Sequence, residues 1–150
     1  MMKAFKRFYV WGMTTKRNMG VYFSALVFFC GIIAFLCGQG FLSLLSLLQM
    51  LLLSFAIAAL QSFILPDGTD YSRGVLFGRA VAWAGASALA IFAASLWGGW
   101  LAVPGWLPGL LLGAAMFVGL FAMLIGEQFK QEIETEQLNE ALRRRRPAES

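Results

Sequence analysis

Apolar residues gather into four long runs, separated by short segments of polar and turn-forming residues. The runs cover residues 19–38, 41–65, 74–97 and 109–126. A transmembrane helix needs about 20 mainly apolar residues to cross about 30 Å of hydrocarbon. The pattern therefore predicts an all-α integral membrane protein, folded as a bundle of four transmembrane helices.

The segments between the runs carry turn signals. Gly38-Gln39-Gly40 makes a short uncharged turn, and the stretch from Pro66 to Asp70 contains the turn pair Asp67-Gly68. The third connection, residues 98–108, carries no charge. We expect the tryptophans in and beside it to form an aromatic belt at the outer membrane interface; they are Trp97, Trp100 and Trp106.

Charge is confined to one predicted side of the membrane. Residues 18–66 and 80–126 contain no charged side chain, and the twelve basic residues form three clusters outside these two stretches. The clusters are Lys3, Lys6, Arg7, Lys16 and Arg17; Arg73 and Arg79; and Lys130 with Arg143, Arg144, Arg145 and Arg146. Because basic residues favour the cytoplasmic side, both termini are predicted to lie in the cytoplasm. The expected location is the cytoplasmic (inner) membrane, which the chain would cross several times.

Composition agrees with lipid as the solvent and argues against catalysis. The 150 residues are 59% hydrophobic and 13% charged, with no His and a net charge of +4. A soluble domain carries roughly 25% charged residues. The sequence has no phosphate-binding loop, nucleophile elbow or cluster with metal-ligand spacing. We therefore predict no enzyme activity, no cofactor, no metal and no direct binding of nucleic acid.

Two parts are predicted along the chain. Residues 1–126 form the membrane domain, which opens with an interfacial segment, residues 1–18, where aromatic and basic residues alternate. Residues 127–150 form a cytoplasmic helical tail that continues the fourth span. In this tail Glu140 can pair with Arg143 and Arg144 at helical spacing.

The two cysteines, Cys30 and Cys37, are predicted to be small buried packing residues. They share a helix face but lie about 10 Å apart along the axis, from a rise of 1.5 Å per residue. A disulfide requires Cα atoms within about 7 Å, so they do not pair with each other.

Small residues recur at four-residue spacing in the third span and at the start of the fourth. Such ladders let neighbouring helix backbones approach closely. We favour packing within one four-helix subunit, and a seam between copies in a homo-oligomer is the alternative. The candidate packing residues are Gly74, Gly78, Ala82, Ala86, Gly109 and Gly113.

The second span carries a stripe of polar residues on one helix face, formed by Ser43, Ser46, Ser54 and Gln61. One interpretation is a lining for a substrate path. The interpretation we favour is hydrogen bonding across helices, which contributes roughly 0.6 kcal/mol per contact in membranes.

The charged side offers candidate interaction residues, namely Asp67, Asp70, Arg73, Arg79, Arg143, Arg144, Arg145 and Arg146. Arg79 lies one turn inside the third span. Its side chain can extend back to anionic lipid headgroups, or it can belong to a partner-binding cluster with the neighbouring charges. The arginine run either contacts anionic lipid or enforces orientation.

The layout resembles an uncharacterised family of small four-helix bacterial membrane proteins that are often encoded beside LytTR-type DNA-binding regulators. The local similarity is strongest at Leu138-Asn139-Glu140-Ala141-Leu142-Arg143, and weaker at Ser72-Arg73-Gly74-Val75-Leu76-Phe77. The resemblance implies a membrane partner that restrains or modulates a cytosolic regulator, and it implies no catalytic residue.

The leading functional hypothesis is a non-enzymatic membrane protein that acts by protein interaction on the cytoplasmic side. Its partner would be a cytosolic transcription regulator or a transporter. The alternative is a small oligomeric transporter or channel subunit, in which the polar stripe of the second span would serve the substrate.

Overall fold

The structure is a computed structural model that describes residues 2–65 and 72–145. These residues form four helices and no strand: α1 (Met2–Leu36), α2 (Leu44–Ile64), α3 (Arg73–Gly98) and α4 (Leu107–Arg145). Each helix is long and apolar enough to cross a membrane. The predicted all-α architecture of four apolar helices is therefore confirmed, and it indicates a multi-pass membrane protein.

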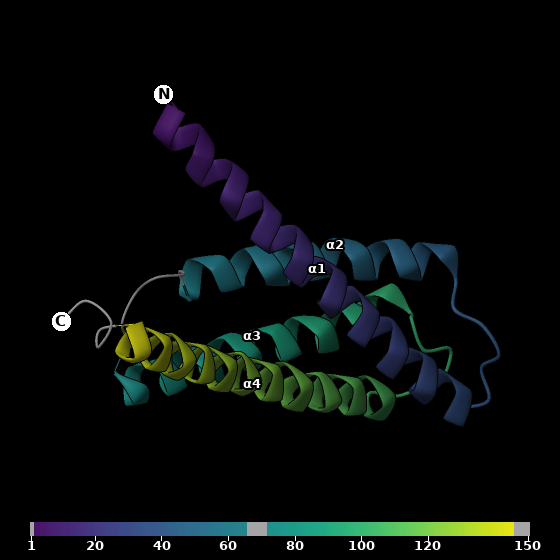
Figure 1. The fold of residues 1–150 in the computed structure, drawn as a ribbon. Helices are drawn as coiled ribbons and strands as arrows, with labels where there is room; N and C mark the ends of the chain where they lie inside the picture. Colours follow the sequence, from purple (N-terminus) through teal and green to yellow (C-terminus); the bar gives the residue numbers. More distant parts are fainter. Residues whose placement is uncertain (1, 66–71, 146–150) are drawn as a thin grey trace.

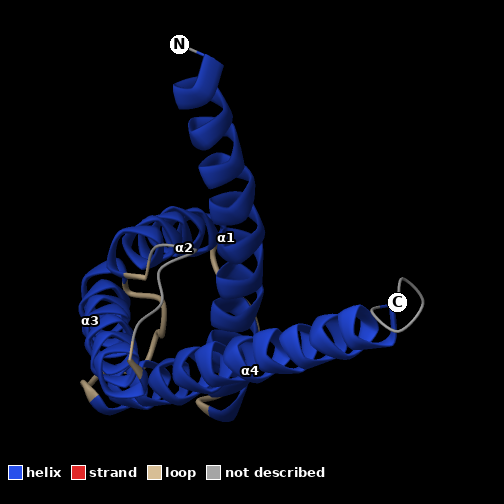
Figure 2. Cartoon of the chain, turned by 60° about the vertical axis from the view of Figure 1, so that its left-hand side comes forward, coloured by secondary structure: helices blue, strands red, loops and turns tan. Residues whose placement is uncertain are grey.

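The helices form a ring in which each contacts its two neighbours (Figure 2). α1 packs against α2 and α4, and α3 packs against α2 and α4. The interior holds fully buried side chains from every helix, the largest being Trp83, Tyr22, Leu26, Met50, Ile91, Leu112 and Met116. The rings of Tyr22 and Trp83 meet there with centroids 5.7 Å apart, which joins α1 to α3 across the ring.

Two helices are much longer than a bilayer requires. α1 has 35 residues and α4 has 39, lengths of about 52 and 58 Å at 1.5 Å per residue. The N-terminal end of α1 projects away from the other helices, and α4 also runs beyond its neighbours (Figures 1 and 2). The predicted interfacial segment is thus the first part of α1, because no residue between it and the span breaks the helix.

At the uncharged end, side chains tie the two connections together. Gln39 donates through Nε2 to the carbonyls of Phe41 and Trp100, at 3.0 and 3.3 Å, and accepts at Oε1 from the backbone N–H of Ala102. Trp100 Nε1 donates to Gln49 Oε1 at 2.7 Å. These bonds give the polar groups of the two connections hydrogen-bond partners within the protein, so that they do not depend on water.

Two sequence-based expectations at this end need correction. Trp97 and Trp106 are exposed, by 94% and 62%, as an aromatic belt requires, but Trp100 is buried. Its indole closes the end of the bundle because Gln49 provides an acceptor inside. Cys30 is buried as expected, whereas Cys37 is exposed, because α1 ends at Leu36 and Cys37 lies in the turn that follows.

The small-residue ladder of α3 also differs from the interpretation we favoured. Gly74, Gly78, Ala82 and Ala86 are exposed on the outside of the subunit, and nothing lies within 4 Å of a Cβ placed on either glycine. Packing within the subunit is therefore wrong for these four residues, because another face of α3 turns inward. The buried residues of α3 are Ala80, Trp83, Ala84, Ser87, Ile91 and Ser95.

The start of α4 does pack closely on α3. A Cβ on Gly109 would lie 2.7 Å from Ser95 Oγ, and one on Gly113 would lie 3.2 Å from the Ala88 carbonyl oxygen. These two glycines allow α4 to approach the α3 backbone, as small residues do in membrane helix pairs.

Candidate functional site at the charged end of the bundle

A buried cluster of polar side chains joins α1 to α2 near the charged end. Gln61 Oε1 accepts hydrogen bonds from Asn18 Nδ2, at 3.0 Å, and from the Tyr22 hydroxyl. Nearby, the hydroxyls of Thr15 and Ser62 lie 3.4 Å apart. Asn18, Tyr22 and Gln61 are all buried. We call these five residues the polar cluster.

The cluster follows from helix periodicity. Thr15, Asn18 and Tyr22 occur at spacings of three and four, so they share the face of α1 that meets α2. An amide oxygen has two acceptor positions, and the two donors from α1 fill those of Gln61. Because an unsatisfied buried amide is costly, the cluster fixes the register between the two helices.

The serines of the predicted polar stripe form hydrogen bonds with nearby residues of the same segment. Ser54 Oγ donates to the Met50 carbonyl at 2.7 Å within α2. Ser43 lies before the helix, where its Oγ accepts from the backbone N–H of Ser46 at 3.0 Å as an N-cap. Of the stripe, Ser46, Ser54 and Gln61 are buried and Ser43 is exposed.

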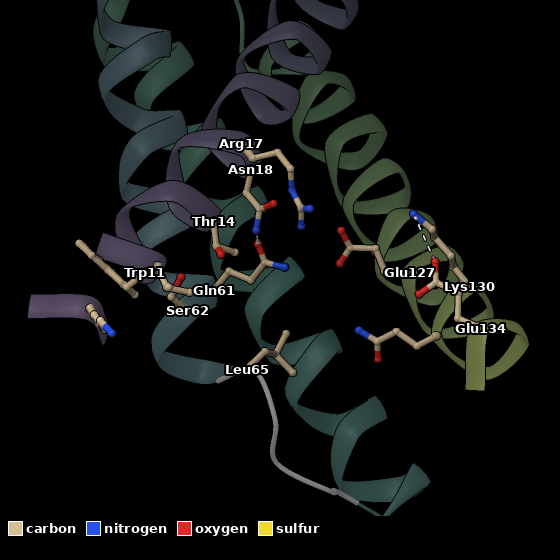
Figure 3. Close-up of a pocket in the computed structure, with 13 residues that line it drawn as sticks. Trp11, Thr14, Arg17, Asn18, Gln61, Ser62, Leu65, Glu127, Lys130 and Glu134 are labelled. Carbon is tan, nitrogen blue, oxygen red and sulfur yellow. Dashed lines mark hydrogen bonds and ion pairs between the residues drawn. The ribbon is translucent and has the colours of Figure 1, made fainter. Parts of the chain in front are cut away.

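Next to the polar cluster lies a cleft of about 730 Å³, between α1, the end of α2 and α4 (Figure 3). We call it the charged-end cleft. Charged residues from two helices line it, together with polar residues that include Asn18 and Gln61 and with three apolar residues. The charged residues are Lys6, Arg17, Glu127, Lys130 and Glu134, and the apolar ones are Val10, Trp11 and Leu65.

The charges in the charged-end cleft are only partly paired. Lys130 Nζ lies 3.8 Å from a carboxylate oxygen of Glu134, one turn away on α4. Arg17 from α1 and Glu127 from α4 point toward each other across the opening (Figure 3). No ion pair within 4.0 Å joins them among the contacts of the described residues. The space between them is thus bounded by a cation on one side and an anion on the other.

The predicted interaction residues do not converge on this cleft. Arg73 pairs with Glu132 of α4 at 3.6 Å, and Arg79 Nη1 donates to the Ile64 carbonyl at 3.1 Å. Arg79 therefore caps the end of α2, whose last carbonyls lack helical partners. Asp67, Asp70 and Arg146 lie outside the described residues.

The arginine run lies on the exposed end of α4. Arg143 and Arg144 are exposed, and Arg144 pairs with Glu140 at 3.9 Å, which confirms the i+4 pair expected from the sequence. The side chain of Arg145 is not described.

Sequence reasoning found Gln61 but missed the other members of the charged-end cleft. The signal for the polar cluster was available, because Thr15, Asn18 and Tyr22 share a helix face at the start of an apolar run. No sequence signal places Arg17 opposite Glu127, since these residues are 110 positions apart and meet only through packing of α1 on α4.

Comparisons with known proteins add no assignment. No protein-family model, no curated protein and no solved structure matches the chain. Within the described ranges, no group of three or more His, Cys, Asp or Glu side chains could hold a metal ion.

Proposed function

We propose that the protein is a non-enzymatic membrane protein that binds a cytoplasmic partner protein. In this proposal it resides in a bacterial inner membrane with both termini in the cytoplasm. All described charged side chains lie on the segments that this orientation places at or beyond the cytoplasmic interface. Basic residues near span ends favour that side.

The observation that carries the proposal is the end of α4, residues 127–145, which we call the α4 extension. It continues the fourth span as one unbroken helix, about 28 Å long at 1.5 Å per residue. Its apolar side chains Phe129, Ile133, Leu138 and Leu142 are 55–63% exposed. Exposed apolar side chains on a projecting charged helix are suited to docking against a partner.

Two partner classes fit the proposal, a transcription regulator in the cytosol and a transporter in the same membrane. The resemblance to proteins encoded beside LytTR-type regulators supports the first class. The similarity falls on residues 138–143, within the α4 extension.

A pull-down in mild detergent from native cells tests the proposal. The full chain is compared with two double variants, Phe129→Gln/Ile133→Gln and Leu138→Gln/Leu142→Gln. We expect at least one of them to lose a partner that the full chain recovers. Thr135→Ala/Gln137→Ala changes two exposed polar positions of the same helix and is the matched control. Recovery of the same proteins by all variants, or of no partner by the full chain, would contradict the proposal.

The alternative of a transporter or channel receives less support. Its motivation was the polar stripe of α2, and Ser54 and Gln61 are engaged in hydrogen bonds within and between helices. Changing Ser46, Ser54 and Gln61 to Leu should abolish any flux of the reconstituted protein if this alternative holds. Flux that persists in the triple variant would exclude the stripe as a path.

A further inference from the structure

Among the residues that the structure describes, two cations and one carboxylate of the charged-end cleft form no ion pair. Lys130 is engaged by Glu134 at 3.8 Å, whereas Lys6, Arg17 and Glu127 make no ion pair among the described residues. The arrangement is positive on the α1 side and negative on the α4 side (Figure 3). A ligand that satisfies both sides must carry both charges.

We propose that the charged-end cleft binds the zwitterionic phosphoethanolamine headgroup of a membrane phospholipid. The phosphodiester lies against Arg17 on α1, and the ammonium lies against Glu127 on α4. A guanidinium donates to phosphate oxygens with charge-assisted hydrogen bonds, and a carboxylate accepts from a primary ammonium in the same way.

The depth of the charged-end cleft supports a lipid as the source of this group. Arg17 is the last charged residue before the uncharged stretch 18–66, and Glu127 is the first after the uncharged stretch 80–126. If the four helices cross a bilayer, both residues lie where hydrocarbon gives way to headgroups.

Size and polarity of the cleft agree with this ligand. Its volume of about 730 Å³ lies within the usual range of small-molecule sites, about 300–1,000 Å³. Thr14, Ser62 and Gln131 add hydroxyl and amide groups to the lining. A purely anionic headgroup would satisfy Arg17 but leave Glu127 facing negative charge.

The inference depends on membrane insertion but not on a protein partner, so the two proposals can fail separately. Purified full-length chain in detergent is mixed with phosphatidylethanolamine, phosphatidylcholine or phosphatidylglycerol, and native mass spectrometry measures the fraction that retains one lipid. We expect phosphatidylethanolamine to be retained about tenfold better than phosphatidylcholine, since methylation removes the ammonium donors.

Two variants test which charged residue binds which part of the headgroup. Arg17→Gln should lower retention of all three lipids about tenfold. Glu127→Gln should abolish the preference for phosphatidylethanolamine over phosphatidylcholine and raise retention of phosphatidylglycerol. Lys16→Gln and Glu136→Gln are matched controls, because each removes the same charge at an exposed position outside the cleft. Circular dichroism verifies the helical fold of each variant.

Soluble phosphoethanolamine distinguishes the two sources of the headgroup. If it competes with the lipid and depends on Arg17 and Glu127, a free compound can occupy the cleft. If only the lipid binds, with the same dependence, the membrane is the source. Equal retention of the ethanolamine and choline lipids, or equal losses in Arg17→Gln and Lys16→Gln, would overturn the proposal.

Discussion

At the scale of single residues, buried polar side chains determine how the helices meet. Membrane helices gain little from apolar burial against each other, because lipid tails are as apolar as their side chains. Packing and hydrogen bonds must then select the register. Gln61 provides such a bond on α2 for two donors of α1, and Gln49 provides one for Trp100.

Replacing Gln61 with Leu should lower the free energy of unfolding by about 1–2 kcal/mol, because Asn18 and Tyr22 lose their shared acceptor. Thermal unfolding in detergent, followed by circular dichroism, measures the change. Gln137→Leu, at an exposed position of α4, is the control. The double variant Asn18→Leu/Gln61→Leu should cost less than the sum of its single changes, and strict additivity would show that the two amides do not interact.

The indole of Trp100 is predicted to stabilise the uncharged end through its N–H group. Trp100→Phe keeps an aromatic ring but leaves Gln49 Oε1 without this donor. We therefore expect the free energy of unfolding to fall by about 1 kcal/mol. Trp97→Phe is the matched control, since Trp97 is almost fully exposed. Unfolding in a denaturing detergent compares the two, and equal midpoints would contradict the role of the 2.7 Å bond.

At the scale of elements, hydrophobic run length predicted the four helices well but not their full extent. At the charged end the first run begins after Arg17 and the fourth ends before Glu127, and a charged residue does not by itself end a helix. Lys16 and Arg17 are good helix formers, so α1 continues through them, and α4 likewise continues from Gly126 into its charged extension. At the uncharged end, positive φ angles at Gly38 and Gly99 end α1 and α3.

The four-residue spacing of the glycines did not predict which of them contact another helix, because spacing alone does not tell which helix face turns inward. Gly113 meets α3, whereas Gly78 has nothing within 4 Å of its Cβ position. We therefore expect Gly113→Leu to destabilise the fold by about 1–3 kcal/mol through overpacking. Gly78→Leu should not destabilise the isolated subunit, because nothing lies within 4 Å of its Cβ position. Thermal unfolding of both variants measures this, and equal sensitivity would show that both faces are packed.

At the scale of the whole molecule, the charged-end cleft arises from contacts that no local pattern specifies. Periodicity marks Thr15, Asn18 and Tyr22 as one polar face of α1, and the charge pattern marks one end of the bundle. Arg17 faces Glu127 only because α1 packs against α4 in the ring of helices, and no local pattern of the sequence predicts that contact. The sequence therefore predicted the chemistry of this end but not the cleft.

Orientation of the whole molecule can be tested with a native cysteine. Cys37 is exposed at the uncharged end and Cys30 is buried, so a membrane-impermeant maleimide should label intact spheroplasts at Cys37 alone. Cys37→Ser should abolish the label. In that background, Thr135→Cys on the α4 extension should react only after permeabilisation. Labelling of Thr135→Cys in intact spheroplasts, together with protection of Cys37 in the native chain, would show that the orientation is the reverse. The charged-end cleft and the α4 extension would then face away from the cytoplasm, and a cytosolic partner would be excluded.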